Sequence, residues 1–519
     1  TISPDGKHAW VPSNKLNLGR GMLRDGRTLD FESTVRPILS KIDLEKCQEL
    51  FEDQLDLDDR SQPNAVAFSP LGDYAYVSIQ GSNAVEIRDA YDGSRVHAVE
   101  NEGKAPRGLV LNAEGNRLFV HNFLSRTVTV HDVSGLVDQT LGSVSLLASI
   151  PTVEKERLPT NILKGKQIFY NANDKRMSRD GYISCASCHQ DGGQDGQVWD
   201  FTDRGNGLRN TLPLEGRFGL GHGNLHWTAN FDEIQDFEND IRSSFGGNGF
   251  LSEEDFELTK DSLGAPKKGR NEDLDALAAF VASHRTPPKS PYRHEDGTFT
   301  ESAKEGSKIF KQLNCATCHA DYFLTDGNLH DVGTVQPSSG KDQGRIIKGI
   351  ETPTLIGLWK TSPYLHDGSA PTLDNLLGNI NHGGAKSLTI DERSSLVSFL
   401  LQIEYEGPTL PASFPDKTYL EKPSFLKQPQ NRQAAVGGGV TFSIQPNGYP
   451  KPSISWQKFE NRKWRAIKNE TRDQLTLSDL TINDSVTYRG VLSNTSGTTY
   501  SKSAKLYVLS KPTFTAQPA

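Results

Sequence analysis

Two copies of the pattern Cys-x-x-Cys-His constrain this chain more than any other feature. The first copy is Cys185-Ala186-Ser187-Cys188-His189 and the second is Cys315-Ala316-Thr317-Cys318-His319. Two thiols at this spacing add to the two vinyl groups of a haem, and the imidazole that follows reaches the iron. A zinc site would need four ligands for each metal, and no further cysteine lies near either copy. The sequence therefore predicts two covalently attached haems, with His189 and His319 as the proximal iron ligands.

The attachment chemistry also predicts where the protein works. Haem of this type is attached outside the cytoplasm, so we expect a periplasmic, cell-surface or secreted protein. Cys47 is the one cysteine outside the two motifs, and this usage does not resemble a disulfide framework. Residue 1 falls inside a repeat, so we expect the true N-terminus to lie upstream.

Charge and hydropathy exclude two classes of partner. The net charge of −8 and a pI of about 5.9 argue against a nucleic-acid partner and against a polybasic membrane patch. No apolar run approaches the ~18 residues that a membrane span requires. We therefore expect no nucleic acid and no membrane span in this segment of the protein.

A second repeat surrounds the two motifs. Gly165-Lys166-Gln167-Ile168-Phe169 precedes the first, and Gly306-Ser307-Lys308-Ile309-Phe310 precedes the second. A helical apolar pattern then closes each half, at Leu274, Leu277, Ala278 and Val281 and at Leu396, Phe399, Leu400 and Ile403. The order of helix, attachment motif, long loop and helix is that of a class I cytochrome c domain. We predict two such mainly-α domains in tandem, at residues 158–296 and 297–407.

The N-terminal 150 residues contain a third repeat. Residues 1–12 recur at 67–78 and at 110–121, and the last two copies lie 43 residues apart, which is the period of a propeller blade. Each copy shows alternating strands joined by a turn, and the pattern resembles the YVTN-type β-propeller repeat. The longer first interval predicts an insertion within residues 14–60. Two and a half blades cannot close a ring, so further blades are expected upstream; an isolated three-stranded sheet would leave exposed edges.

The C-terminal part changes to short alternating strands after a proline-rich link at Pro408, Pro411, Pro415 and Pro423. Trp456 and Tyr488 give residues 420–510 a resemblance to an immunoglobulin-like β-sandwich. Ser443 and Gly490 stand where that fold places its paired cysteines, so the core must hold without the bridge. The sequence of residues 423–429 is echoed at residues 512–518, which predicts the start of a further immunoglobulin-like module at 511–519.

The middle of the chain resembles the bacterial di-haem cytochrome c peroxidase and MauG superfamily over roughly residues 160–405. The resemblance is carried by Arg209-Asn210-Thr211, Phe323 to Gly327, His330 to Thr334, Thr352 to Leu355, and Ser362 to Gly368 followed by Thr372-Leu373. It implies an oxidoreductase that reduces peroxide, or uses peroxide to oxidise a substrate, at the first haem. The second haem would relay electrons from a donor or acceptor protein.

The resemblance also implies residues for the first haem. Trp227, in Leu225-His226-Trp227, matches the tryptophan that the family places between its haems, although a buried aromatic that packs on porphyrin is the alternative. The family's distal glutamate comes further along the chain than any glutamate of this segment, so the match is a departure. Glu238, and after it Glu233, are the candidates for the distal acid or base. The competing interpretation is that both acids decorate a solvated helix face.

The second haem departs from the family. Ile380 occupies the position of the family's methionine or tyrosine ligand and cannot bind iron, and Met22 and Met177 are the only methionines. His382 is the candidate sixth ligand, which would give a bis-histidine haem; a surface histidine in a glycine-rich loop is the alternative. His330 and His366 are expected to support ligands, and His222 is a candidate for a switchable ligand of the first haem.

The family also binds calcium between its haem domains. The matching positions are Asn210 through its side chain and Thr361 and Pro363 through their carbonyl groups, and oxygen ligands suit this cation.

Three functions remain open. The first is the peroxide-linked oxidoreductase, with hydrogen peroxide or another small oxidant as a partner. The second is a non-catalytic electron-transfer cytochrome of a large cell-surface protein, and the third uses dioxygen, as in di-haem rubber-cleaving oxygenases. A five-coordinate first haem favours catalysis, whereas two six-coordinate haems favour electron transfer.

Overall fold

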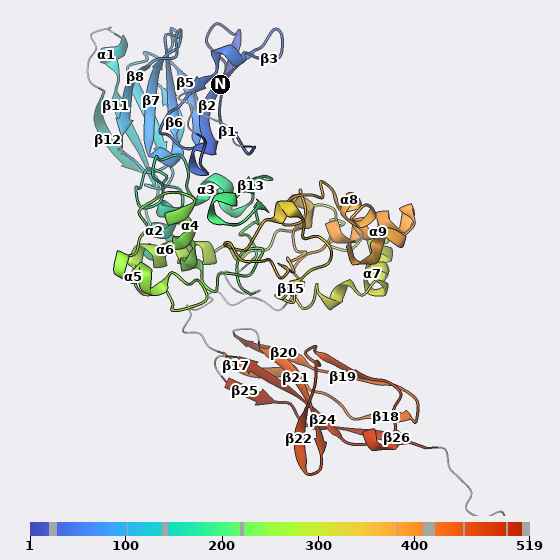
Figure 1. Ribbon diagram of the computed structural model, residues 1–519. Coiled ribbons are helices and arrows are strands. Elements are labelled where there is room, and N and C mark those ends of the chain that lie inside the picture. The colour runs from blue at the N-terminus through green and yellow to red at the C-terminus, as the bar shows by residue number, and fades with distance from the viewer. Residues whose placement is uncertain are drawn as a thin grey trace, which may run out of the picture. The chain divides into compact units, whose positions relative to one another are not determined.

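The computed structural model describes residues 1–19, 28–100, 102–137, 144–217, 223–380, 382–407, 421–449, 452–494 and 497–510 (Figure 1). The chain divides into two compact units, Thr1–Gly407 and Pro408–Ala519. Several predicted features lie outside the described residues: His222, Met22, the first three prolines of the link and the further module at 511–519. No helix of the described ranges is long and apolar enough to cross a membrane.

Three antiparallel sheets of four strands form the N-terminal region (Figure 1). They consist of β1 (His8–Leu16), β2 (Val35–Asp43), β3 (Gln48–Glu49) and β4 (Leu55–Asp56); β5 (Pro63–Phe68), β6 (Tyr74–Ile79), β7 (Ala84–Asp89) and β8 (Arg95–Glu100); and β9 (Pro106–Leu111), β10 (Arg117–Asn122), β11 (Thr127–Asp132) and β12 (Ser145–Pro151). The short helix α1 (Ser134–Val137) precedes β12. The second and third sheets pair consecutive strands in the order of the chain, as the repeats predict.

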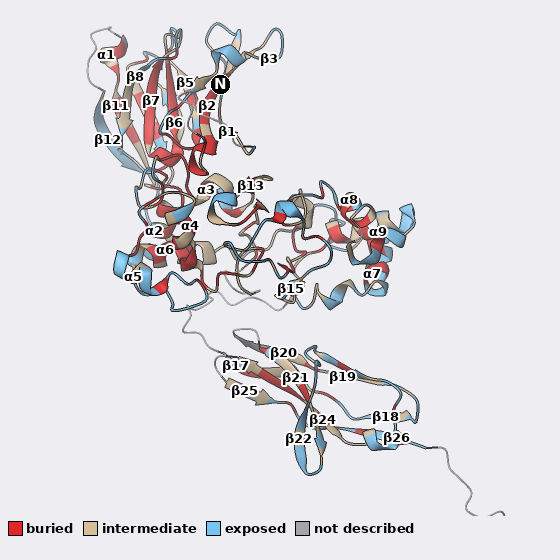
Figure 2. Ribbon diagram, viewed as in Figure 1, coloured by how far each residue is buried: buried red, intermediate tan, exposed pale blue. Residues whose placement is uncertain are grey.

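The sheets pack face to face like neighbouring propeller blades. Trp10, Leu39 and Leu57 of the first share a core with Val66 and Val77 of the second. The central strands β6 and β7 are buried on both faces (Figure 2). Within the described residues the sheets form no closed ring, so the region is propeller-like. The predicted insertion is the long connection between β1 and β2, which holds a 3₁₀ turn at Glu32–Thr34.

Two helix pairs follow. In the first, α2 (Thr160–Phe169) packs on α6 (Glu272–Ala282), and in the second, α7 (Glu301–Gln312) packs on α9 (Ile390–Leu401). A Cβ atom added to Gly165 would lie 1.8 Å from the carbonyl oxygen of Ala276, and one added to Gly306 would lie 2.0 Å from that of Ser395. Only glycine permits helices to cross so closely, so the repeated motif marks the same crossing in each half.

Shorter elements lie between the long helices. They are α3 (Cys185–Cys188), α4 (Glu238–Ser243), α5 (Glu253–Thr259) and α8 (Leu373–Gly378), with the two-stranded sheets β13 (Val198–Asp200) with β14 (Leu208–Asn210) and β15 (Leu329–His330) with β16 (Ile350–Glu351). Most of the remaining chain in this region is irregular.

The C-terminal unit is an immunoglobulin-like β-sandwich. Its strands are β17 (Glu421–Lys427), β18 (Arg432–Ala435), β19 (Val440–Ser443), β20 (Gln445–Tyr449), β21 (Ser453–Glu460), β22 (Lys463–Ile467), β23 (Gln474–Leu477), β24 (Thr487–Asn494), β25 (Gly497–Tyr500) and β26 (Ala504–Leu509). Trp456 is buried in the core beside Phe442 and Tyr488, and the Tyr488 hydroxyl donates a hydrogen bond to the carbonyl of Asp484. This bond has the form of the tyrosine corner of such domains.

One predicted core position is corrected by the structure. A Cβ atom added to Gly490 would lie 2.8 Å from Cδ1 of Ile444, so Ile444 and not Ser443 faces Gly490. Side chains alternate between the faces of a strand, and an error of one residue therefore exchanges the inner and outer positions. The apolar Ile444 side chain fills space that a disulfide occupies in related folds.

Candidate active site

The first attachment motif forms one wall of a mainly apolar cavity. Cys185 and Cys188 lie on the single turn of α3, and His189 follows directly. At the start of this turn the backbone nitrogen of Ser184 donates a hydrogen bond of 3.0 Å to the Ser187 hydroxyl. Nδ1 of His189 lies 3.4 Å from the carbonyl oxygen of Gly193, which leaves Nε2 as the metal-binding nitrogen. Two thiols and an oriented imidazole at one cavity wall fit a covalently attached haem.

The second motif lines a separate cavity in the second helix pair. Nδ1 of His319 lies 3.2 Å from the carbonyl oxygen of Leu324, so this imidazole is oriented in the same way as His189. His382 lines the same cavity, and its ring centre lies 6.2 Å from that of His319. Two imidazoles that bind one metal ion from opposite sides, each through a bond of roughly 2 Å, have ring centres roughly 6 Å apart. The spacing therefore fits a haem held by both histidines.

Trp227 lies in the wall between the two cavities and lines both of them. Its indole nitrogen donates a hydrogen bond of 2.9 Å to the carbonyl oxygen of Asn210, and its own carbonyl accepts one from the backbone nitrogen of Glu351. The ring is thus fixed in a buried position next to each haem cavity. This placement is the one that an electron relay requires, and Trp227 keeps that role as a proposal.

Arg217 and Glu351 line both cavities as well. Nε of Arg217 and Oε1 of Glu351 are buried and have no hydrogen-bond partner among the described residues. Burial lowers the pKa of Arg217 to about 10. A buried guanidinium with an unused donor fits a carboxylate, and a haem carries two propionate groups. Sequence reasoning did not single out Arg217 or Glu351, because neither lies in an attachment motif.

Glu351 leads to a prediction about pH. Burial raises the pKa of Glu351 from 4.5 to about 8, although Arg217 opposes the shift. The folded protein therefore binds this proton more tightly than the unfolded chain, and the resulting stabilisation is lost as the pH rises from about 4.5 through about 8. We expect Glu351→Gln to reduce this loss by on the order of a few kcal/mol. Denaturant unfolding at pH 6 and pH 9, followed by haem absorbance, measures the free energy of unfolding of the parent protein and of Glu351→Gln. The same pH dependence of this free energy in the two proteins would contradict a raised pKa of Glu351.

The two predicted distal glutamates lie outside the lining of the first cavity. Glu238 is completely buried, and its carboxylate accepts hydrogen bonds from the backbone nitrogens of Phe250 and Leu251 and pairs with Arg242. Glu233 begins the 3₁₀ turn at Ile234–Phe237 and accepts a hydrogen bond from the backbone of Lys267. Neither side chain lies on a solvated surface, and each carboxylate holds a neighbouring backbone segment in place through its hydrogen bonds. Their distal role stays a prediction, and these contacts do not favour it.

A different acid–base group faces the first cavity. His226, Asp240 and Arg204 all line it, and Asp240 forms an ion pair with Arg204 and lies beside His226. Nε2 of His226 lies 3.5 Å from Asp240, and Nδ1 lies 2.8 Å from Oδ1 of Asn230. Burial alone would raise the pKa of Asp240, but Arg204 and His226 outweigh it and lower the pKa to about 2. His226 stood in the tryptophan motif, but nothing in the sequence indicated that Asp240 would meet it.

The predicted calcium positions come together at the second cavity. Asn210, Thr361 and Pro363 all line it, and the Asn210 side-chain amide contacts the carbonyl oxygen of Pro363. Oδ1 of Asn210 is buried without a hydrogen-bond partner among the described residues. The Asn210 amide can be rotated by half a turn, because its orientation is assigned from its hydrogen bonds. Oδ1 would then point at the Pro363 carbonyl oxygen, and a cation suits two such oxygens.

The two histidines that are expected to support ligands make separate contacts. His330 pairs with Asp326, and buried His366 lies near Trp227.

Comparison with known proteins finds relatives whose names include MauG and cytochrome-c peroxidase. Hydrazine synthase subunit gamma of Kuenenia stuttgartiensis is 29% identical over 278 residues, which cover 44% of this chain and 75% of that protein. Methylamine utilization protein MauG of Methylorubrum extorquens is 27% identical over 304 residues, covering 49% and 81%. Cytochrome-c peroxidase IdrP2 of a Pseudomonas species is 24% identical over 360 residues, covering 52% and 92%.

Three family models match separate parts of the chain. A seven-bladed β-propeller lactonase model matches residues 33–155, and an immunoglobulin I-set model matches residues 423–508. A RoxA-like, cytochrome c-like model matches residues 349–381, which include Glu351 and helix α8. The matches confirm the predicted order of a propeller-like region, a cytochrome c region and an immunoglobulin-like domain.

Proposed function

Since this chain belongs to the di-haem cytochrome c peroxidase and MauG superfamily, we propose that it reduces peroxide, or uses peroxide to oxidise a substrate, at a haem on His189. The part related to these proteins is fused to a propeller-like region and an immunoglobulin-like domain. A second haem on His319 relays electrons. Covalently bound haem c follows from the relatives. We also propose that the chain carries two haems. They would lie in two tandem class I cytochrome c domains, at residues 158–296 and 297–407.

One difference between the cavities carries the proposal. In the second cavity, His382 faces His319 and its Nδ1 has no hydrogen-bond partner among the described residues. In the first, the histidine that the structure describes besides His189 is His226, and both of its ring nitrogens lie near polar partners. Among the described residues, the second cavity thus offers two histidines for an iron, whereas the first offers His189 and a His226 whose ring nitrogens face other partners. An iron with an open position can react with a small oxidant, whereas a six-coordinate iron exchanges electrons only.

The chain supplies protons and an electron path for this reaction. Bound haem provides the iron at which the O–O bond of a peroxide is reduced, and this reduction consumes two electrons and two protons and yields water. His226 is the proposed proton-transfer group, because it lines the first cavity and Asp240 orients it. Arg204 places positive charge at the same wall, where charge develops as the bond breaks. Trp227 offers an aromatic bridge to the second cavity.

Optical and EPR titration with hydrogen peroxide tests the function. We expect one high-spin and one low-spin haem in the ferric protein, and a spectral change of the high-spin haem when peroxide is added. Two low-spin haems that do not respond would instead support the electron-transfer cytochrome. A response to dioxygen in the reduced protein, without peroxide, would support the oxygenase alternative.

His382→Ala tests the relay site. We expect it to convert the low-spin EPR signal to a high-spin one, because the second haem loses a strong-field ligand while Cys315, Cys318 and His319 still hold it. His330→Ala is the matched control, since His330 lines the same cavity but pairs with Asp326. An unchanged low-spin signal in His382→Ala would show that this residue is a loop histidine.

The remaining parts of the proposal follow from haem attachment and from the calcium positions. The protein is exported to the periplasm, the cell surface or the medium, and it exchanges electrons with a partner protein. A calcium ion bound by Asn210 and the carbonyl groups of Thr361 and Pro363 would join the two haem domains.

A further inference from the structure

We propose that the propeller-like region is part of the first haem site: Phe31 completes the cavity wall and Glu32 fastens it there, so that this region shields the first haem from solvent and limits access to it. The inference rests on the proposed haem at Cys185, Cys188 and His189. Phe31 and Glu32 belong to the connection between β1 and β2, at the start of the 3₁₀ turn Glu32–Thr34.

Phe31 enters the wall of the first cavity. It is 4% exposed and lines the cavity together with both attachment cysteines. Its ring stacks on Phe201 at a centroid distance of 4.5 Å and packs against Trp199 at 5.4 Å. Cys188 packs against the same apolar cluster. An aromatic side chain from the connection between β1 and β2 thus covers the cavity on the side of the Cys188 attachment.

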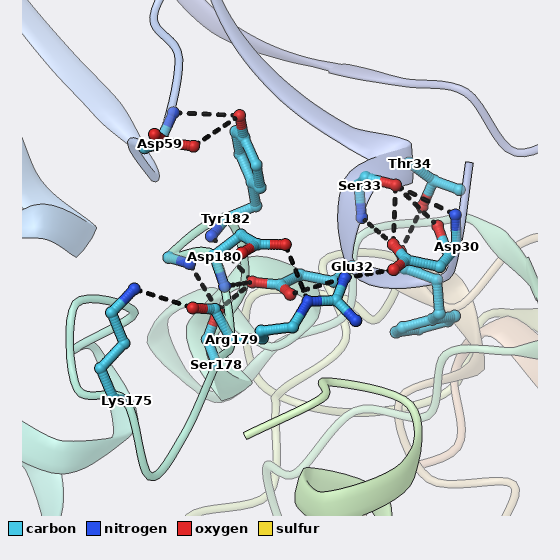
Figure 3. A network of polar contacts seen from close by, with 12 residues as sticks. Asp30, Glu32, Ser33, Thr34, Asp59, Lys175, Ser178, Arg179, Asp180 and Tyr182 are labelled. Carbon is cyan, nitrogen blue, oxygen red and sulfur yellow. Dashed lines mark hydrogen bonds and ion pairs between the residues drawn. The ribbon is translucent and has the colours of Figure 1, made fainter. Parts of the chain in front are cut away.

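Glu32 fastens this segment to the loop that leads into the attachment motif (Figure 3). Its buried carboxylate accepts hydrogen bonds from the Ser178 hydroxyl and from the backbone nitrogens of Asp180 and Tyr182. The guanidinium of Arg179 lies 3.7 Å from Glu32 and also pairs with Asp30. A buried carboxylate with this many donors holds its backbone in one position.

A second contact joins the same loop to the sheets. The Tyr182 hydroxyl accepts a hydrogen bond of 3.0 Å from the backbone nitrogen of Asp59 and lies 3.1 Å from the Asp59 carboxylate (Figure 3). The Ser61 hydroxyl donates to the carbonyl oxygen of Tyr182. Residues 178–182 are therefore held from two points of the N-terminal region, directly before Cys185.

The two attachment motifs differ in how far the surrounding protein buries them. Ala186, between the first pair of cysteines, is completely buried in a cluster that includes Ala105, directly before β9, and Leu124, in the turn between β10 and β11. Ala316, at the equivalent place in the second motif, is exposed. Among the described residues, the N-terminal region contributes Phe31 to the lining of the first cavity and contributes no residue to the lining of the second. The apolar shell around a metal site controls solvent access and reduction potential, so these contacts act on the reactive haem.

Phe31→Ala in the full chain tests this role. We expect the ferric first haem to bind added imidazole on the order of 10-fold faster than in the parent protein, because an aromatic wall is lost. We also expect the midpoint potential of the first haem to fall, since solvent stabilises the more highly charged ferric iron. The potential of the second haem should not move. Stopped-flow absorbance and a spectroscopic redox titration measure these quantities.

Matched variants separate shielding from general damage. Phe51→Ala removes a phenylalanine of the same region that is 74% exposed, and it should leave both haems as in the parent. Phe31→Leu retains apolar volume and should give an intermediate rate, and Glu32→Gln should shift the rate in the same direction as Phe31→Ala. Parent-like imidazole binding and potentials in both Phe31→Ala and Glu32→Gln, or equal shifts of both haems, would overturn the proposal.

Haem content distinguishes this failure from failure of the proposed function. Two haems in the pyridine haemochrome assay with an unchanged first haem contradict the shielding role alone. Fewer than two haems in the parent protein contradict the haem assignment itself. If Phe31→Ala does not fold, the comparison of Phe31→Leu with Phe51→Ala still decides the outcome.

Discussion

Replacing Cys185 and Cys188 together with alanine should leave one covalently bound haem per chain instead of two and should abolish the reaction with peroxide. The two thiols are the only ones in the first cavity within the described part of the chain, and His189 alone does not provide a covalent bond. The pyridine haemochrome assay counts the haems, and EPR should retain only the low-spin signal of the second site.

Three variants serve as controls for this loss. Cys47→Ala removes an exposed cysteine outside both motifs and should keep two haems and full activity. Cys315→Ala with Cys318→Ala should remove the low-spin haem instead. Cys185→Ala alone keeps one thioether and guards against a general failure to fold. Two haems in the first double variant would contradict the assignment of this site.

The sequence repeats predicted the elements that local pattern determines. The Gly-x-x-Ile-Phe motif marks a helix with a close crossing, because Gly165 and Gly306 each face a backbone carbonyl of the partner helix. Alternating strands predicted the sheets of the N-terminal region and of the C-terminal sandwich. The His382 prediction rested on the elimination of Ile380 and of both methionines, and its distance from His319 supports it.

Features that depend on contacts between distant segments were not predictable from pattern. Phe31 lies far from Cys188 along the chain, and no periodicity links the two. The position of Glu351 beside both cavities depends on how Trp227 and the two cavities lie in space, which no local pattern determines. Glu238 and Asp240 are two residues apart on one short helix, and the sequence alone does not show which carboxylate faces the cavity.

The reaction with peroxide distinguishes these two carboxylates. His226→Gln should slow peroxide cleavage by about 10²–10⁴-fold, the range expected for a positioned proton-transfer group. Asp240→Asn should slow it as well, because Asp240 orients His226 and pairs with Arg204. Glu238→Gln should leave the rate unchanged and should lower the free energy of unfolding by about 1–3 kcal/mol, since its buried hydrogen bonds weaken.

Stopped-flow mixing with hydrogen peroxide, with haem content and unfolding measured on the same samples, decides between the assignments. Glu233→Gln is a further control, because its carboxylate binds the Lys267 backbone away from the cavity. If Glu238→Gln is slow while His226→Gln and Asp240→Asn react as the parent does, the glutamate inferred from the family resemblance is the distal group. If no variant changes the rate, this segment does not transfer the proton, and the buried Glu351 becomes the next group to replace.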